Sequence, residues 1–279
     1  DDKRDPVPTW IGKPFRMKEF YEKFYAAIER SPVHSAFCER AYGIDLGQHG
    51  FADREQLELL LQATHMGPAD RVLEIGCGDG RIAEYLSDST GARMTGLDYI
   101  ESAIRSAQRR TASKSERLSF LTGDINRLEL PAAAYDIILS IDSMYFSRAY
   151  GGTIRAMRAA LRSGGRLAVF FSHGREPWVP REAFREETLP PGRTPLAAAL
   201  RENGLVFAVW DLTDADYRLA LRRREALKEL KERFAAEGLT FIYENRMGDA
   251  EGVRQAVEEG LHARYLYIAR AAGSFGLSS

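Results

Sequence analysis

From residue 71 onward, short apolar runs alternate with stretches whose apolar residues recur every three or four positions. Runs of this length separated by helical stretches predict β-α-β units and a parallel sheet with helices on both faces. We therefore expect an α/β protein with seven strands. The apolar runs that predict strands are residues 72–75, 94–98, 118–124, 135–142, 166–172, 205–212 and 264–271.

Helical patterns also occur before the first strand and between the last two. Residues 17–30 have apolar side chains at helical spacing, Ser31 precedes a proline as a helix N-cap does, and Asp53 is placed to cap a further helix. Helical stretches near 214–236 and 249–260 follow the sixth strand. We expect an N-terminal helical cap over residues 1–52, a core over 53–279, and a helical lid inserted at about 212–261.

Composition narrows the class of partner. The chain has 279 residues, of which 44% are hydrophobic and 28% charged, as in an ordinary globular protein. Its formal net charge of −1 provides no excess positive charge to bind a phosphate backbone, which argues against nucleic acid. No apolar stretch is long enough to span a membrane. Cys38 and Cys77 are too few for a disulfide framework and lack metal-site spacing, so we expect a cytoplasmic protein without a metal.

The strongest motif is V-L-E-I-G-C-G-D-G at residues 72–80, between a predicted strand and a predicted helix. Glycines at 76, 78 and 80 allow the backbone to turn sharply and approach a ligand closely. A nicotinamide-dinucleotide fingerprint requires a third glycine where this chain has Arg81, and Glu74 stands inside the strand end. The loop therefore predicts a flat polar cofactor and disfavours a dinucleotide.

Acidic residues close the next strands. Asp98 ends the second apolar run, where a carboxylate accepts the hydroxyl hydrogens of a ribose, and Asp124 ends the third, where an adenine amino group would lie. Either residue alone is more often a helix cap or a solvated loop residue. Because the carboxyl ends of parallel strands meet at one edge of the sheet, we expect both in one site.

In this order, E-I-G-C-G-D-G, L-D-Y, G-D-I and S-I-D-S-M-Y resemble the motifs of class I S-adenosylmethionine-dependent methyltransferases, over roughly residues 55–172. The resemblance implies a Rossmann-like, doubly wound seven-stranded sheet, S-adenosyl-L-methionine as cofactor and S-adenosyl-L-homocysteine as product. It assigns the glycine loop to the methionine part, Asp98 to the ribose and Tyr99 with Asp124 to the adenine. The cofactor-binding residues that it implies are Glu74, Gly76, Cys77, Gly78, Gly80, Asp98, Tyr99, Asp124, Ile125, Ser140, Ile141 and Asp142.

The layout of the whole chain resembles lidded small-molecule methyltransferases such as those acting on glycine, sarcosine or phosphoethanolamine. The N-terminal helices, the segment 42–51 and the insertion before the last strand are the shared features. This likeness implies methyl transfer to a nitrogen or oxygen of a small-molecule acceptor. It also predicts that those segments close the pocket.

Candidates for catalysis and acceptor binding follow from position alone. His49, in the loop before the core, and His173, after the fifth strand, are candidate general bases, although a structural role fits either histidine equally well. Tyr145 is a neighbour of the methyl site. Four aromatic residues could surround a cationic amine: Tyr42, Tyr145, Trp178 and Tyr217. Arg218 could bind an acidic group of the acceptor. Core packing and a solvated helix face explain the same residues.

Other functions remain open. A module that binds S-adenosylmethionine without turnover has the same fold, and fold alone does not establish activity. Methylation of a protein or a nucleic acid is a further alternative, although residues 142–145 (D-S-M-Y) lack the Pro-Pro-aromatic element of adenine amino methylation. A nicotinamide oxidoreductase is disfavoured by Arg81. We expect a monomer or homodimer that does not associate with membranes.

Overall fold

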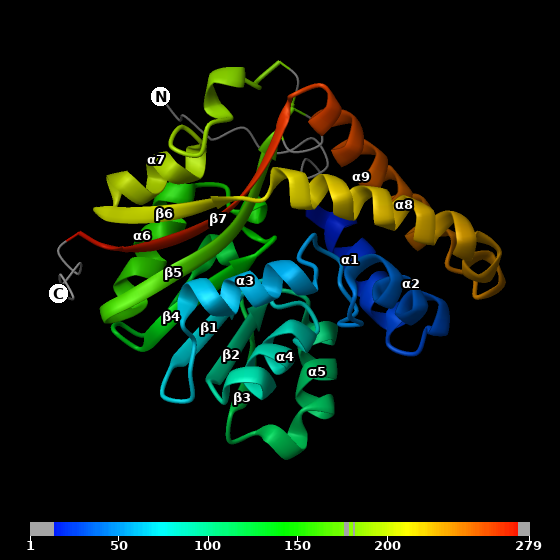
Figure 1. The fold of residues 1–279 in the computed structure, drawn as a ribbon. Helices are drawn as coiled ribbons and strands as arrows, with labels where there is room; N and C mark the ends of the chain where they lie inside the picture. The colour runs from blue at the N-terminus through cyan, green and yellow to red at the C-terminus, as the bar shows by residue number, and fades with distance from the viewer. Residues whose placement is uncertain (1–13, 176–178, 181, 273–279) are drawn as a thin grey trace.

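The computed structural model describes residues 14–175, 179–180 and 182–272. Its centre is a seven-stranded sheet in the order β3-β2-β1-β4-β5-β7-β6, which confirms the predicted α/β fold and its strand count (Figure 1). The strands are β1 Arg71–Ile75, β2 Arg93–Asp98, β3 Leu118–Thr122, β4 Tyr135–Ile141, β5 Leu161–Gly174, β6 Leu205–Asp211 and β7 His262–Ala271.

One strand differs from the predicted parallel sheet. The pairs β1–β2, β1–β4, β2–β3 and β4–β5 are parallel, but β7 lies between β5 and β6 and is antiparallel to both. The chain leaves β6 and returns into β7 at the same edge of the sheet, and neighbouring strands joined in this way are antiparallel. The segment between them, residues 212–261, therefore stands at the carboxyl edge, where ligands of such sheets bind.

The helices are α1 Pro14–Ile28, α2 Pro32–Tyr42, α3 Arg54–Thr64, α4 Arg81–Thr90, α5 Glu101–Arg110, α6 Tyr150–Ala160, α7 Pro195–Glu202, α8 Thr213–Ala236 and α9 Thr240–Glu258. The predicted N-caps are confirmed: the side chains of Ser31 and Asp53 each accept a hydrogen bond from the backbone N–H of the third residue of the helix, in α2 and α3 respectively. Such a cap stabilises a helix by about 1 kcal/mol. Helix α9 begins at Thr240 rather than at 249, because tertiary packing buries Arg246 and stabilises a helix across Gly248.

Apolar side chains cover both faces of the sheet. On β5, Val169 and Phe171 face a cluster that includes α6 and α7, while Phe170 between them faces a cluster that includes α3 and α4. This double burial explains why the strands are continuous apolar runs rather than alternating ones. None of the helices among the described residues is both long and apolar enough to cross a membrane.

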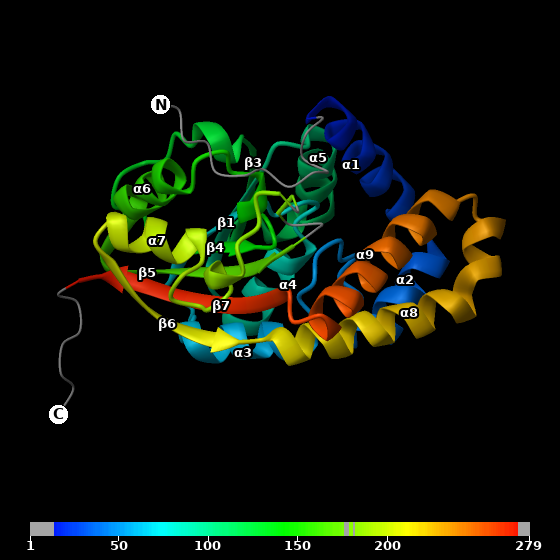
Figure 2. The ribbon, with the colours of Figure 1, turned by 90° about the horizontal axis from the view of Figure 1, so that it is seen from above.

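Helix α5 packs against β2 and β3, whereas α1, α2, α8 and α9 lie beyond the carboxyl edge of the sheet. Figures 1 and 2 show α1 and α2 beside α8 and α9, with α8 packed against α2 and α9. The N-terminal helices and the insertion between β6 and β7 thus come together over one edge, although they are far apart in sequence.

Candidate functional site

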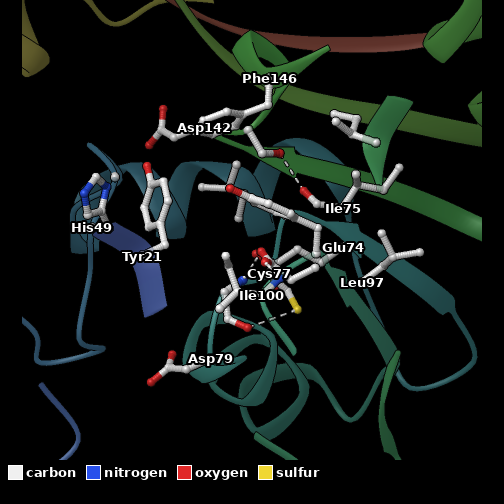
Figure 3. Close-up of a pocket in the computed structure, with 18 of the residues that line it drawn as sticks. Tyr21, His49, Glu74, Ile75, Cys77, Asp79, Leu97, Ile100, Asp142 and Phe146 are labelled. Carbon is white, nitrogen blue, oxygen red and sulfur yellow. Dashed lines mark hydrogen bonds between the residues drawn. The ribbon is translucent and has the colours of Figure 1, made fainter. Parts of the chain in front are cut away.

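A cavity of about 510 Å³ lies at the carboxyl ends of β1, β2, β3 and β4. Helix α1 and the loop of residues 46–52 form its other wall (Figure 3). A volume of this size is typical of sites for small molecules and cofactors. The strand ends that the sequence singled out therefore open into a single cavity.

The glycine loop after β1 is held close to β2. Gly76 and Cys77 both donate their N–H groups to the carbonyl oxygen of Leu97, at 2.7 and 3.1 Å. Gly76 and Gly78 have φ of +77° and +56°, and a Cβ atom at Gly78 would lie 2.2 Å from the hydroxyl of Tyr25. Only glycine fits this backbone without displacing α1 or distorting the loop.

Asp98 anchors the loop at the end of β2. Its two carboxylate oxygens accept hydrogen bonds from the N–H groups of Gly78 (2.8 Å) and Ile100 (2.9 Å). Burial raises the pKa of Asp98, and the hydrogen bonds from Ile100 and Gly78 oppose that rise. Each carboxylate oxygen has a further lone pair, so the side chain can still accept hydrogen bonds from ligand hydroxyls.

Glu74 lies within the same cavity and carries an unpaired polar atom. Its side chain is buried, and its Oε2 has no hydrogen-bond partner among the described residues. Burial, and then the negative charges of Asp98 and Asp79, raise the pKa of Glu74 to about 8. A pKa in this range favours the protonated carboxyl group at neutral pH, and a cationic ligand group beside it would favour the ionised form.

Asp142, at the end of β4, has its carboxylate fully engaged. It accepts hydrogen bonds from Phe51 N (2.6 Å), Tyr145 Oη (2.7 Å) and Arg264 Nη1 and Nη2 (2.5 and 3.2 Å). Its φ of +52° places it in the left-handed region, which non-glycine residues rarely adopt. The ion pair with Arg264 fixes the loop of residues 46–52 against the sheet, so Asp142 shapes the cavity and is not placed to act as a free base.

Helix α1 covers the cavity with aromatic side chains. Met17, Tyr21 and Tyr25 line it, and the ring of Tyr21 lies 4.8 Å from that of His49 between ring centroids (Figure 3). Phe20 and Phe24 belong to the apolar spacing that predicts the helix at 17–30, whereas Tyr21 and Tyr25 were not singled out for the site. Their spacing of four residues, one position after each phenylalanine, is the signal that could have identified a second helix face.

His49 is a neutral imidazole in this wall. Its Nε2 has no hydrogen-bond partner among the described residues, and its ring also contacts Phe24 at 5.0 Å between centroids. Burial, followed by the positive charges of Arg246 and Arg223, lowers the pKa of His49 well below 6.5. His49 is among the residues that line the cavity, although its Nε2 is itself buried, and a neutral imidazole nitrogen is able to accept a proton.

Most residues predicted for the cofactor line the cavity. They are Glu74, Gly76, Cys77, Gly78, Asp98, Tyr99, Asp124, Ile125, Ile141 and Asp142. Gly80 and Ser140 are not among the lining residues: a Cβ atom at Gly80 would lie 2.3 Å from the Phe120 ring, and the Ser140 hydroxyl is bonded to that of Ser143 at 2.7 Å. Both therefore support the loop from behind.

The residues predicted for the acceptor are not brought together. His173 bonds through Nε2 to the Thr188 hydroxyl at 2.7 Å and stacks on Phe171, away from the cavity. Tyr42 is buried and donates to Gly50 O. Tyr145 donates to Asp142, and Tyr217 and Arg218 lie on the outer side of α8, where Tyr217 donates to Glu258. Trp178 lies outside the described residues. Of the candidate bases, only His49 lines the cavity.

Comparisons with known proteins agree with this geometry. Residues 72–165 match the family described as a methyltransferase domain. The 27-O-demethylrifamycin SV methyltransferase of Amycolatopsis mediterranei (strain S699) is 29% identical over 176 residues, which cover 59% of this chain and 58% of that protein. The chain thus spans less than two thirds of this curated relative.

Two solved structures show how widely the fold is shared. Phosphoethanolamine N-methyltransferase 2 of Haemonchus contortus, with phosphomonomethylethanolamine and S-adenosylhomocysteine, superposes with a TM-score of 0.70 at 19% identity, over 89% of this chain and 60% of that chain. The [4+2]-cyclase SpnF superposes with a TM-score of 0.61 at 21% identity, over 78% and 80%. Together with the family match, these likenesses confirm the predicted Rossmann-like methyltransferase fold and the resemblance to class I S-adenosylmethionine-dependent methyltransferases.

Proposed function

We propose that this protein transfers a methyl group from S-adenosyl-L-methionine to a nitrogen or oxygen atom of a small-molecule acceptor and releases S-adenosyl-L-homocysteine. The observation that carries the proposal is the single cavity in which the glycine loop, Asp98 and the residues after β3 meet, within the matched methyltransferase domain. The methyltransferase activities of the relatives support it.

The lining residues fit the cofactor part by part. The loop at Gly76 and Gly78 has no side chains to exclude the methionine part, and Asp98 has acceptor capacity left for the ribose hydroxyls. Asp124 and Tyr99, which also line the cavity, are the residues that we propose for the adenine. The unpaired Oε2 of Glu74 suits a cofactor that is positively charged.

When bound, the cofactor supplies an activated methyl group, so the task of the protein is to position the acceptor and exclude water. We assign this task to the wall of α1 and residues 46–52, with α8 and α9 behind it as the lid. We propose that the chain divides into a helical cap over residues 1–52 and a core over residues 53–279, with the lid inserted in the core at about residues 212–261. The closely packed α2, α8 and α9 support it.

A binding titration tests the cofactor directly. We expect the protein to bind S-adenosylmethionine and S-adenosylhomocysteine, and not NAD, in isothermal titration calorimetry. Turnover with labelled S-adenosylmethionine and a panel of small amines and phenols then separates an enzyme from a silent binding module. Absence of binding by either sulfur compound to folded protein would refute the proposal. Binding without transfer to small molecules would favour a non-catalytic module or an enzyme that methylates protein or nucleic acid. The neighbour SpnF is an example of this fold named for a reaction other than methyl transfer.

His49 is the general base that we propose for acceptors that must lose a proton. His49→Gln should lower kcat for a phenol acceptor by about 10² or more, with the affinity for S-adenosylhomocysteine retained. Because its pKa lies well below 6.5 in the folded protein, turnover should stay constant from pH 8 down through 6.5 and fall only at lower pH.

The control for this variant is His65→Gln, since His65 is exposed on the loop after α3 and does not line the cavity. It should have normal turnover. Equal kcat in His49→Gln and the unmodified protein would exclude His49 as the base.

The setting of the enzyme is also a proposal. Both cysteines are free and buried, which supports a reducing compartment, and we place the enzyme in the cytoplasm. The low net charge supports a small acceptor rather than a nucleic acid. We propose a monomer or homodimer, to be distinguished by light scattering.

A further inference from the structure

Two buried arginines face one carboxylate between α8 and α9. Arg223 and Arg246 have no exposed surface, and the nearest acidic atom is Oδ2 of Asp249, 3.5 Å from Arg223 Nη2 and 3.7 Å from Arg246 Nη1. The guanidinium of Arg223 lies 4.9 Å from the ring centre of Phe51, and that of Arg246 lies 4.9 Å from the ring centre of Phe24. The rings hold the guanidinium groups in place but do not neutralise their charge.

Much of the hydrogen-bonding capacity of this pair is unused. Nε and Nη1 of Arg223, and Nε and Nη2 of Arg246, have no partner among the described residues. A guanidinium has five N–H groups, and a buried charge without partners is strongly destabilising. Four unpaired donor atoms on two adjacent forks are suited to the oxygens of a carboxylate or phosphate.

The charges around the pair do not balance. Asp249 is one negative charge against two positive ones. The neighbouring groups of α2 and the loop before α3 are neutral: burial lowers the pKa of His34 to about 3, lowers that of His49 well below 6.5, and raises those of Tyr42 and Cys38. One positive charge remains, so a singly charged anion would neutralise the group.

The pair lies directly behind the wall of the cavity. Arg246 Nη1 donates to the carbonyl oxygen of His49 at 2.9 Å, and His49 and Gly50 line the cavity itself. On the other side, the side chain of Asp249 is 26% exposed, so the group of three charges borders solvent at Asp249. The loop of residues 46–52 would separate an anion bound here from the proposed methyl-transfer site.

We propose that Arg223 and Arg246 bind a singly charged oxyanion, a carboxylate or phosphodiester group, at a site of its own behind the wall of the cavity. The inference goes beyond the proposed function: neither arginine lines the cavity, and an anion bound to the pair would help to fix the loop that carries His49, because Arg246 donates to the carbonyl oxygen of that residue. The two forks bind the oxyanion, and Asp249 limits the site to one negative charge.

The probes are acetate, dimethyl phosphate and inorganic phosphate, titrated at constant ionic strength against chloride and followed by calorimetry. Acetate or dimethyl phosphate should bind saturably. Arg223→Gln and Arg246→Gln should each weaken that binding by about tenfold or more, since each removes a fork. Arg233→Gln, at an exposed position of α8, is the matched control and should bind like the unmodified protein. The ratio of the affinities for acetate and dimethyl phosphate shows whether the site prefers a carboxylate or a phosphodiester.

Asp249→Asn tests the charge balance even if an arginine variant does not fold. It leaves two positive charges, so the preference should move from acetate toward doubly charged phosphate by about tenfold or more at pH 8. An unchanged preference, or equal anion binding by the arginine variants and the Arg233 control, would overturn the inference. S-adenosylhomocysteine binding, measured on every variant, separates this result from failure of the proposed function: cofactor binding without anion binding removes only the anion site.

Discussion

Asp98→Ala is expected to weaken the binding of S-adenosylhomocysteine by roughly a hundredfold. Two ribose hydroxyls that donate to a charged carboxylate contribute about 1.5 kcal/mol each, and every 1.4 kcal/mol is about a factor of ten in affinity. The variant also releases the N–H groups of Gly78 and Ile100 that Asp98 now holds. Calorimetric titration of S-adenosylhomocysteine into both proteins measures the difference.

Two further variants make this result specific. Asp98→Asn keeps the shape of the side chain, and its amide oxygen can still accept one backbone hydrogen bond, so its loss should be smaller than that of the alanine variant. Asp211→Asn changes an exposed carboxylate at the end of β6, outside the cavity, and should bind normally. Similar affinities in all four proteins would show that Asp98 does not bind the cofactor.

The sequence predicted those features that depend on local patterns. Strand ends meet at one edge in any parallel sheet, so the grouping of Glu74, Asp98 and Asp124 followed from their positions alone. The N-cap at Asp53 depends only on a side chain and the following turn, and it too could be predicted.

Features that depend on distant contacts could not be predicted. Arg264 contacts residues on three other elements, and no local pattern records such contacts. The placement of Tyr21 and Tyr25 over the glycine loop depends on how α1 packs across the sheet edge, which helical periodicity does not define. The direction of β7 likewise depends on its position between β5 and β6, which its own sequence does not specify.

Arg264→Gln should lower the free energy of unfolding by about 3–5 kcal/mol, the usual cost of removing one partner from a buried ion pair. The side chain of Arg264 has no exposed surface and that of Asp142 is 4% exposed. The variant leaves the Asp142 carboxylate buried without its cation, and it also removes donors to Gln56 Oε1 (2.9 Å) and the Ser172 hydroxyl (3.0 Å). Urea denaturation of the two proteins at neutral pH gives this difference. Arg270→Gln, at the other end of β7, should cost less than about 1 kcal/mol and serves as the control.

The same pair connects the stability of the fold to the shape of the cavity. Asp142 accepts a hydrogen bond from Phe51 N, so the position of the loop that carries His49 depends on the carboxylate that Arg264 holds. Asp142→Asn should therefore also destabilise the protein, although asparagine tolerates the left-handed backbone at this position. Because each single variant leaves one charge buried and the double variant Asp142→Asn/Arg264→Gln leaves none, the double variant should lose less stability than the sum of the two single losses. Strict additivity in urea denaturation would mean that the two side chains act independently, and the cavity wall would then have to be held by apolar packing and by the hydrogen bonds from Tyr42 to Gly50 and from Arg246 to His49.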